Sequence, residues 1–544
     1  MTITIRQSWS SKHGFRWKGL KGVLILAALL IVSIQSLSAQ ETSVGTDLQE
    51  FLKFPGLELL EYENRQVVKA SLQTTLLLVV KFNSTLKSAL LGEEIAASAL
   101  MAVQERHNPT LDHSVSFRRT ANSSSSFSDE VPPHLIYNVN RSQSFSSRWS
   151  KRLSNGISYS ATLSGNSSSN RTYTIPKENG SLEDAGRGDD PLVTSSLTVG
   201  MSVPLFQDWG EVNDIPVFKS GVRQEESKTN TLRTELQILE TFARIYWDLA
   251  GLWKTRTVLQ EAIKLSEQLV KENRILAQFG KIKPIDIKQS EIQLHRNQQS
   301  FLEIENSIHT VEDQVKVALN LKELPYGFLP GDTPRFRPLS FNFEQQLEKV
   351  YLHSADLMAL QSRLKTNQYD LEEALNQEEP DLDLSVSYTL GGGEQNFANT
   401  FDAYGRTQLH GYQVGLTWSV PLFDQQTPQL ISQNKLARAR LDIEVSLKKD
   451  ELYVDLKTIQ RNLNFAEQDI KNTAIIRELA QEVLNQEIEK QKLGQSTGFQ
   501  VSQAQQELIS AQSSEIQSLI NYEKIYLSLL VLTGDIFEQF QIPR

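Results

Sequence analysis

Histidines and paired acids are the side chains of this sequence best suited to catalysis or metal binding. The eight histidines are scattered along the chain. His107 and His113 are six positions apart, whereas two zinc ligands on one helical face need a spacing of four. The adjacent acids at 93–94 and 378–379 lie in charged segments, where solvated carboxylates are the usual condition. We therefore predict no catalytic residue, no cofactor-binding residue and no metal ligand.

Three further absences narrow the functional class. The chain has no cysteine, so thiolate metal sites, iron–sulfur clusters and disulfides are excluded. The sequence contains no phosphate-binding glycine loop and no nucleophile elbow. Its net charge of −10 argues against a nucleic-acid partner, because neutralising phosphates requires clustered lysine and arginine. The sequence thus predicts a protein that is not an enzyme and uses no cofactor.

The first 39 residues have the composition of a signal peptide. An apolar run at 23–34 follows a basic segment, and LSA at 37–39 predicts cleavage before Gln40. The alternative is a retained membrane anchor, but this run of about 12 residues is shorter than the ~20 that a spanning helix needs. No other apolar run is long enough to form such a helix. If the mature chain enters a membrane, it must use β-strands.

The elements that follow occur twice. PTLDHSVSF at 109–117 reappears as PDLDLSVSY at 380–388, and SVPLF at 202–206 reappears at 419–423. A glycine interrupts the next helical sequence 76 positions after Pro204, at Gly280, and 73 positions after Pro421, at Gly494. We interpret the chain as a tandem duplication. The expected divisions are a signal peptide at 1–39, a first repeat at 40–324, a linker or equatorial segment at 325–345, a second repeat at 346–534 and a C-terminal tail at 535–544.

Each half ends in a pair of long helices. The stretch 429–493 has no glycine or proline, and a continuous helix of that length extends roughly 100 Å. The stretch 222–279 matches it and is interrupted only by Gly251. With return helices near 285–323 and 499–533, we expect helical hairpins at 222–324 and 429–534, which are too long for a globular core. The apolar residues of the second hairpin alternate by three and four positions, as in a coiled-coil seam: Leu456, Ile459, Leu463, Ala466 and Ile470.

Each half also contains two segments in which apolar residues alternate with small polar ones. This pattern is typical of β-strands with one face in lipid and the other toward a watery lumen, although a sheet packed on a soluble core is the alternative. Four strands cannot close a barrel, since the smallest membrane barrels have about eight. Strands in lipid therefore require several copies: two chains would supply eight strands and three would supply twelve. The apolar faces comprise Leu111, His113, Val115 and Phe117; Leu197, Val199, Met201 and Val203; Leu382, Leu384, Val386 and Tyr388; and Val414, Leu416, Trp418 and Val420.

The segment between the first two strands is longer than its counterpart. There are 95 positions from Pro109 to Pro204, against 41 from Pro380 to Pro421. The triplet SNG at 154–156 lies between two alternating runs and is a hairpin-turn signal. We expect 121–193 to form an external insert with one additional hairpin and a flexible loop, with plain disorder as the alternative.

These landmarks resemble the TolC family of outer-membrane efflux and type I secretion channels over nearly all of the mature chain. GKIKPIDI at 280–287 resembles the family's periplasmic hairpin turn. LTG at 532–534 is similar to its final-helix ending, and HSADL at 353–357 to the opening of its second repeat. The SVPLF segments are similar to its strand-ending signature, with the residues Pro204, Leu205, Phe206, Pro421, Leu422 and Phe423.

The resemblance implies a mixed α/β fold made mainly of long α-helices. The expected assembly is a homotrimer with a twelve-stranded transmembrane β-barrel continued by a periplasmic α-helical barrel. The expected location is the cell outer membrane, in contact with its lipid, with a long periplasmic extension. The implied function is a passive exit duct of a tripartite efflux pump or a type I secretion system. Its partners would be a periplasmic adaptor (membrane fusion) protein and an inner-membrane transporter.

The hairpin turns are the expected contact with the adaptor. In some family members, acids six and nine residues after the second glycine form a cation-binding ring. Gln500 and Gln503 occupy these positions here, so we expect no acidic constriction from them. Asp286 is the first-hairpin counterpart, where complementing a helix dipole is an alternative role. The candidate contact residues are Gly280, Ile282, Asp286, Gly494, Gly498 and Gln500.

Two other classes of protein fit parts of the pattern. A periplasmic adaptor also carries a long helical hairpin, but a single one flanked by small β-domains. A coiled-coil surface protein would have sustained heptads without the duplicated strands.

Overall fold

A computed structural model of the chain describes residues 51, 53–62, 65–128, 131–176, 183–188, 192–339, 341–394, 404 and 410–543. The chain divides into two units, Met1–Lys53 and Phe54–Arg544, and the elements named below belong to the second. The expected signal peptide at 1–39 lies outside the described residues, as do parts of the expected insert.

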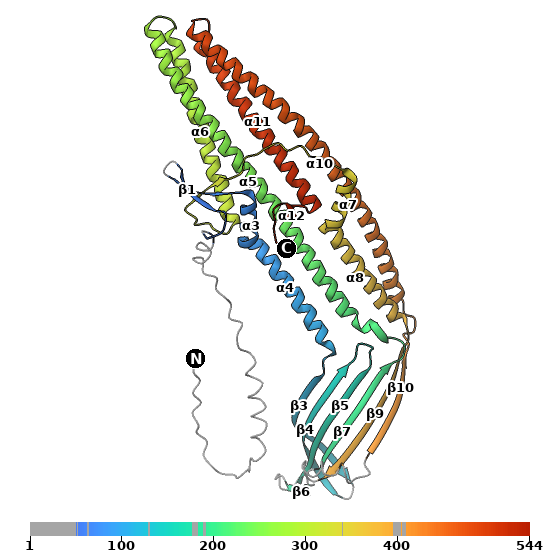
Figure 1. Cartoon of the computed structure of the whole chain (residues 1–544). Coiled ribbons are helices and arrows are strands. Elements are labelled where there is room, and N and C mark those ends of the chain that lie inside the picture. The colour runs from blue at the N-terminus through green and yellow to red at the C-terminus, as the bar shows by residue number, and fades with distance from the viewer. Residues whose placement is uncertain are drawn as a thin grey trace, which may run out of the picture. The chain divides into compact units, whose positions relative to one another are not determined.

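Helices form most of the second unit (Figure 1). They are α3 (Leu72–Phe82), α4 (Ser84–Gln104), α5 (Ile215–Gln278), α6 (Pro284–Ala318), α7 (Phe343–His353), α8 (Ala355–Glu378), α10 (Gln426–Lys492), α11 (Gly498–Thr533) and α12 (Ile536–Gln539), with 3-10 turns η1 (Glu105–His107) and η2 (Gly210–Asp214). The strands are β1 (Glu58–Tyr62), β2 (Arg65–Ala70), β3 (Thr110–Ser128), β4 (Val131–Arg152), β5 (Ser158–Pro176), β6 (Glu183–Gly188), β7 (Leu192–Pro204), β8 (Gly327–Pro330), β9 (Asp381–Glu394) and β10 (His410–Ser419). In the part of the chain that the structure describes, no helix is both long and apolar enough to span a bilayer.

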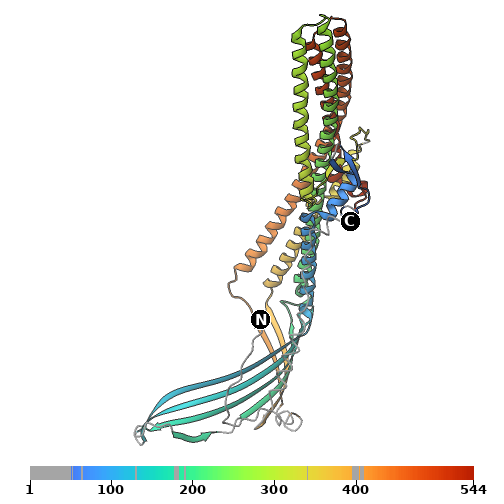
Figure 2. The ribbon, with the colours of Figure 1, turned by 90° about the vertical axis from the view of Figure 1, so that its left-hand side faces the viewer.

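Two long hairpins, α5–α6 and α10–α11, run side by side (Figures 1 and 2). α5 has 64 residues and α10 has 67, so each extends roughly 100 Å. α5 continues through Gly251, where an added Cβ would lie 2.2 Å from Cδ1 of Ile520 on α11. The missing side chain therefore lets the two hairpins approach each other closely.

Most of the α10 residues expected to form a seam lie in a packed core. The residues Leu456, Leu463, Ala466 and Ile470 are buried in one cluster with Tyr522 of α11, and other helices contribute to it. Ile459 packs against the same cluster with partial exposure. Burying a large aliphatic side chain contributes about 1.5–3 kcal/mol, so this seam is a main source of hairpin stability.

α6 ends at Ala318, earlier than the boundary expected near 323. Asn320 has a φ of +58°, and the Leu321 amide donates to the Lys316 carbonyl over 2.8 Å. This is the Schellman arrangement, in which Asn320 ends the helix by adopting the left-handed backbone conformation. The chain then enters 325–345, where β8 pairs in parallel with β2 in the three-stranded sheet β1-β2-β8.

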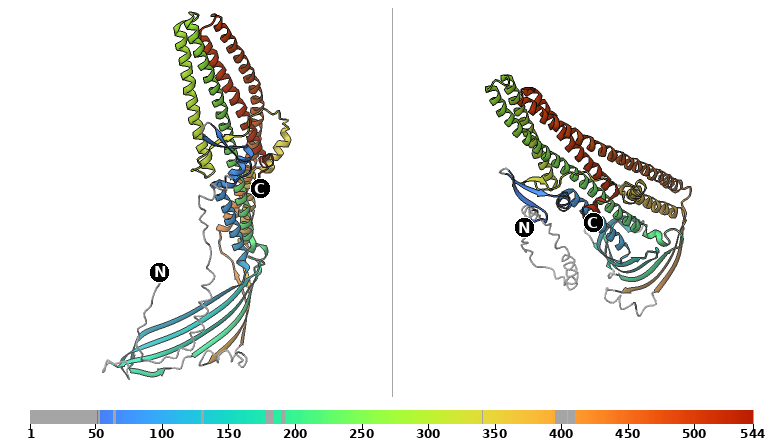
Figure 3. Two further views of the ribbon diagram at one scale, coloured as in Figure 1. Left: turned by 60° about the vertical axis from the view of Figure 1, so that its left-hand side comes forward. Right: turned by 45° about the horizontal axis from the view of Figure 1, so that its top comes forward.

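A seven-stranded antiparallel sheet lies at the other end of the long helices from the hairpin turns (Figure 1). The sheet is curved (Figure 3). Its strand order is β10-β9-β7-β5-β4-β3, and β6 pairs with β5 beside this path. The expectation of four strands is wrong, because the path alone contains six.

The two strands beyond the expected four come from the segment 121–193, where one additional hairpin was expected outside the sheet. The prediction that this segment is an external insert is wrong for most of its length, because β4 and β5 lie between β3 and β7. Residues 158–168 of β5 pair with 192–202 of β7. The turn at 154–156 does form, with Gly156 at a φ of +91°. It lies at the helical end of the sheet, where the Gly210 amide donates to the Asn155 carbonyl over 3.2 Å.

Toward the helical end of the sheet, the expected separation of polar and apolar faces continues across all six strands of the path. Cross-strand partners point to the same face of a sheet, so the register assigns each residue to a face. One row of partners on the polar face is Thr110, Ser150, Ser160, Gly200, Ser387 and Gln413. The next row, on the opposite face, is Leu111, Trp149, Ala161, Val199, Tyr388 and Tyr412.

Candidate functional site

The polar face of the large sheet is lined with hydroxyl groups that bond across the strands. Ser116 and Ser144 join β3 to β4 with their oxygens 2.7 Å apart. Ser164 and Ser196 join β5 to β7 at 2.8 Å, and a threonine pair joins β7 to β9 at 3.0 Å. Because these hydroxyl side chains are small, water can reach the polar groups of this face, as it does in the wall of an aqueous passage.

The opposite face exposes large apolar side chains. Tyr412 on β10 is 84 % exposed, and Phe117 on β3 is 76 % exposed. A contiguous apolar surface of this kind is unfavourable in water and is typical of a face that contacts lipid or another protein. Other exposed apolar side chains of this face are Leu111, Val115, Val199, Tyr388, Val414, Leu416 and Trp418.

The strand-end signature lies where the sheet meets the helices. β7 ends at the buried Pro204, and the Leu205 amide donates to the Leu382 carbonyl over 2.8 Å. After β10, Phe423 has a φ of +60° and is 96 % exposed. Both signatures therefore place apolar side chains at the boundary between the sheet and the helices. The other exposed members are Leu205, Phe206, Pro421 and Leu422.

The two hairpin turns have the same backbone conformation. Gly280 has a φ of +67° and Gly494 a φ of +77°. The amide after each glycine donates to the carbonyl five residues earlier, from Lys281 to Leu276 over 3.0 Å and from Gln495 to Lys490 over 2.9 Å. This is the Schellman cap, and it needs a residue tolerant of positive φ.

The returning helices also begin alike. Asp286 accepts a hydrogen bond from the Lys283 amide over 3.2 Å, and Gln500 accepts one from the Thr497 amide over 2.9 Å. Each side chain is the third residue of its helix and satisfies the cap residue's amide, as in a capping box. Asp286 therefore caps α6, at the helix N-terminus where its charge was expected to complement the helix dipole.

Asp286 also connects the two hairpins. Its Oδ1 accepts a hydrogen bond from the Gly498 amide over 3.2 Å. An added Cβ at Gly498 would lie 3.0 Å from the Asp286 carbonyl oxygen, so the glycine permits this approach. Asp286 and Gly498 are buried and Ile282 is half-buried, whereas Gly280, Gly494 and Gln500 are exposed.

Four large apolar side chains stand exposed around these turns, and the sequence analysis missed them. Phe279 and Leu493 precede the two glycines and are 74 % and 73 % exposed. Ile285 and Phe499 occupy equivalent places five residues after the glycines and are also exposed. The sequence signal that could have identified these four residues is that they occupy matching positions in the two repeats. Exposed apolar groups on rigid turns are suited to docking a partner protein.

Beneath the turns, the helices are joined by a buried polar network. Asn273 donates to Ser290 over 2.6 Å and accepts from Gln491 over 3.1 Å, which links α5, α6 and α10. On the surface nearby, hydrogen bonds from Lys288 and then Arg274 lower the pKa of Glu291 to about 2. These specific polar bonds therefore supplement the apolar packing of the helices near the tip.

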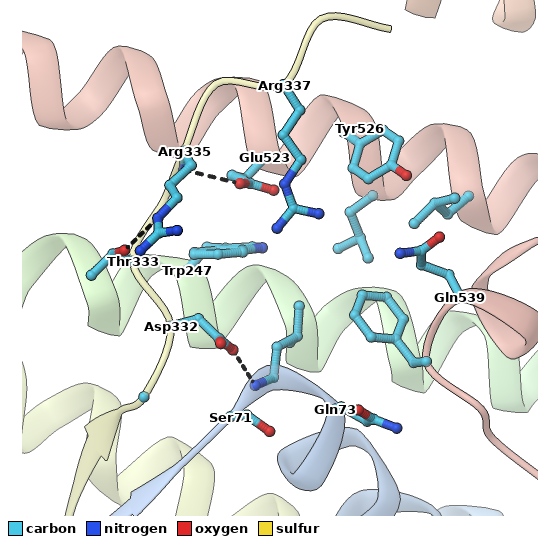
Figure 4. A pocket seen from close by; sticks show the side chains of 15 residues that line it. Ser71, Gln73, Trp247, Asp332, Thr333, Arg335, Arg337, Glu523, Tyr526 and Gln539 are labelled. Carbon is cyan, nitrogen blue, oxygen red and sulfur yellow. Dashed lines mark hydrogen bonds between the residues drawn. The ribbon is translucent and has the colours of Figure 1, made fainter.

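A cavity of about 460 Å³ lies beside the long helices next to 331–337 (Figure 4). The Arg335 amide donates to Glu523 over 3.2 Å, and the Leu72 amide donates to Asp332 over 2.6 Å. Burial raises the pKa of Glu523 above its ordinary value. These bonds connect the segment after β8 to α3 and α11.

Within the described residues, the histidine and acidic side chains are not assembled into a metal centre. His107 lies 2.7 Å from Asp214 and 3.2 Å from the Arg152 carbonyl, which ties the turn between β4 and β5 to the helices. Across the described ranges, no group of three or more histidine or acidic side chains is placed to hold a metal ion.

Solved structures of outer-membrane channels have the same fold. VceC of Vibrio cholerae is 13 % identical, with 85 % of this chain and 96 % of that chain covered and a TM-score of 0.59. The open state of MtrE of Neisseria gonorrhoeae is 14 % identical, covers 85 % and 88 %, and has a TM-score of 0.58. CmeC of Campylobacter jejuni is 14 % identical, covers 87 % and 89 %, and has a TM-score of 0.55.

No protein-family model and no curated protein matches the sequence. The similarity is therefore one of structure, at identities where sequence alone carries little signal. The TolC-like fold expected from the sequence landmarks is confirmed.

Proposed function

We propose that this chain is the outer-membrane channel of an export system. It acts as a passive exit duct, not as an enzyme, for substrates driven by an inner-membrane transporter through a periplasmic adaptor. The observation that carries the proposal is the large sheet, with an exposed apolar face and a hydroxyl-lined face, continued by two long helical hairpins. The fold shared with known outer-membrane channels supports it.

The proposed location is the cell outer membrane. The apolar face of the sheet contacts lipid, and the helices extend into the periplasm. The six strands on the path of one chain are too few for a closed barrel, so several copies must assemble; we propose three, the number that the resemblance to the TolC family implies. The shared caps at Gly280 and Gly494 support the tandem duplication from which the two halves derive.

The turns of the hairpins are the proposed adaptor contact. The exposed side chains at Phe279 and Leu493 give this end an apolar surface that a partner's helical hairpin can cover. Gly280, Gly494 and Gln500 belong to the same exposed surface, while Asp286 and Gly498 hold it in place.

Membrane fractionation tests the location and the channel. We expect a heat-modifiable oligomer in the outer-membrane fraction that forms conducting pores in planar bilayers. A soluble periplasmic protein, or a stable monomer in detergent by native mass measurement, would reject the proposal.

Site-specific photocrosslinking tests the docking surface. A photoreactive residue at Phe279 or Leu493 should form an adduct identified by mass spectrometry as a periplasmic adaptor. The matched control is Leu436 on α10, which is 69 % exposed but lies near the sheet. Equal adaptor adducts from Leu436 would show that the turns are not the specific contact.

A further inference from the structure

Within the part of the chain that the structure describes, the large sheet has two edges without a neighbouring strand. In the path β10-β9-β7-β5-β4-β3, the strands β10 and β3 each have one neighbour among the described residues. Successive strands of the path are antiparallel. Because the path contains an even number of strands, β3 and β10 themselves run in opposite directions. One edge is therefore ready to pair with the other edge of a second copy in the same antiparallel mode.

The two edges also match in their faces. The apolar side chains Val115 and Phe117 on β3 lie on the same face of the sheet as Val414 and Leu416 on β10. Ser114 of β3 lies on the polar face with Gln413 of β10. If β3 of one copy paired with β10 of the next, lipid-facing and lumen-facing rows would both continue without interruption.

Open edges are costly in a bilayer. Each backbone amide or carbonyl without a partner in hydrocarbon costs several kcal/mol, which is why membrane sheets close into barrels. One copy cannot close on itself, since its six path strands are fewer than the roughly eight of the smallest barrels. Copies of the same chain are the partners that fit both edges.

The hairpin β4–β5 is fixed within this wall. An added Cβ at Gly156, in its turn, would lie 2.3 Å from the Asp208 carbonyl oxygen, so the turn is seated tightly against the junction. Arg152 donates to Asn213 of η2 over 2.6 Å at the same place. With β3 on one side and β7 on the other, the hairpin is an integral part of the ladder.

We propose that β3 of each copy pairs with β10 of the next and that three copies close an eighteen-stranded barrel. This inference rests on the proposed trimeric channel and replaces the twelve-stranded barrel expected from the sequence. Barrel diameter grows roughly in proportion to strand number, so the passage is about 1.5-fold wider than a twelve-stranded one. Barrels of 16–18 strands leave an open aqueous channel.

Disulfide crosslinking in the outer-membrane fraction tests the strand order, and the absence of native cysteine removes background. The pair Ser164→Cys with Ser196→Cys should crosslink within one chain, because these side chains are adjacent on β5 and β7. The pair Ser114→Cys with Ser196→Cys should not, because β4 and β5 separate β3 from β7. Crosslinking of the second pair in place of the first would place the hairpin outside the wall and overturn the inference.

A second set of pairs tests the closure between copies. Ser114→Cys combined in turn with Gln413→Cys, Gly415→Cys or Thr417→Cys samples successive registers on the polar face. At least one pair should give a ladder of crosslinked species that ends at three copies. A ladder that ends at two copies, or no crosslink at any register, would overturn the count of eighteen strands.

Deletion of the hairpin gives an independent measurement. Replacing 119–191 with Asn-Gly removes β4, β5, β6 and the end of β3, and keeps the antiparallel alternation between the rest of β3 and β7. The largest polymer that enters the pore from the strand side should then decrease in radius by about 1.5-fold. An unchanged radius would contradict the inference while leaving the proposed function intact, whereas failure of the unmodified protein to reach the outer membrane would reject the proposed function itself.

Discussion

Replacement of Asp286 by alanine is expected to loosen the hairpin tips, through two hydrogen bonds that this side chain makes. One bond, from the Lys283 amide, caps α6. The other, from the Gly498 amide, joins the first hairpin to the second. The side chain is buried, so water cannot readily replace either bond. The variant should therefore destabilise both tips, including the one that does not carry the substitution.

The expected magnitude follows from the two bonds. Loss of a helix cap costs about 1 kcal/mol, and loss of a hydrogen bond to a charged group costs roughly 1.5–3 kcal/mol. Gln500→Ala is the matched control, because Gln500 has the same position in the second hairpin but bonds only within it. The difference between the variants isolates the cross-hairpin bond. It corresponds to roughly a 10- to 100-fold change in a local opening equilibrium.

Amide hydrogen exchange measures this opening directly. The Val501 amide, which donates to the Thr497 carbonyl in the first turn of α11, is the reporter. Asp286→Ala should speed its exchange even though the substitution lies on the other hairpin. If Asp286→Ala altered exchange only in α6, and Val501 kept its wild-type protection, the bond to Gly498 would have no energetic role and the reasoning would be refuted.

Three other perturbations have defined outcomes. Gly280→Ala should destabilise its turn by about 1–2 kcal/mol because φ is +67°, and limited proteolysis of the turn measures this effect. As a control, Gly92→Ala within α4 should stabilise the protein by up to about 1 kcal/mol, and the melting temperature of the whole protein measures that effect. Burial raises the pKa of Glu523 in the folded state, so the folded protein favours the protonated carboxyl. The resulting stabilisation is complete below about pH 4.5 and is lost as pH rises through the raised pKa. Glu523→Gln should therefore melt at a higher temperature than wild type near neutral pH and at the same temperature near pH 4. Gln500 and Gln503 are exposed and uncharged, so wild-type conductance should show little block by divalent cations, and changing both to aspartate should introduce block at least tenfold stronger.

The sequence by itself determined the local features of this protein. The absence of glycine and proline over 429–493 specified a long helix, and the seven-residue spacing of Leu456, Leu463 and Ile470 specified its buried seam. Gly280 and Gly494 marked the turns because positive φ is a property of single residues. Alternation assigned the apolar and polar faces of the strands, since that period is set by the backbone alone.

The tertiary structure decided which segments are neighbours. Alternation does not encode a strand's partner, so the sequence did not reveal that β4 and β5 enter the sheet between β3 and β7. The bond from Gly498 to Asp286 joins residues 212 positions apart, and Gly251 accommodates Ile520 on another hairpin. These contacts depend on the approach of remote segments, which packing and hydrogen-bond satisfaction determine only when the whole chain is folded.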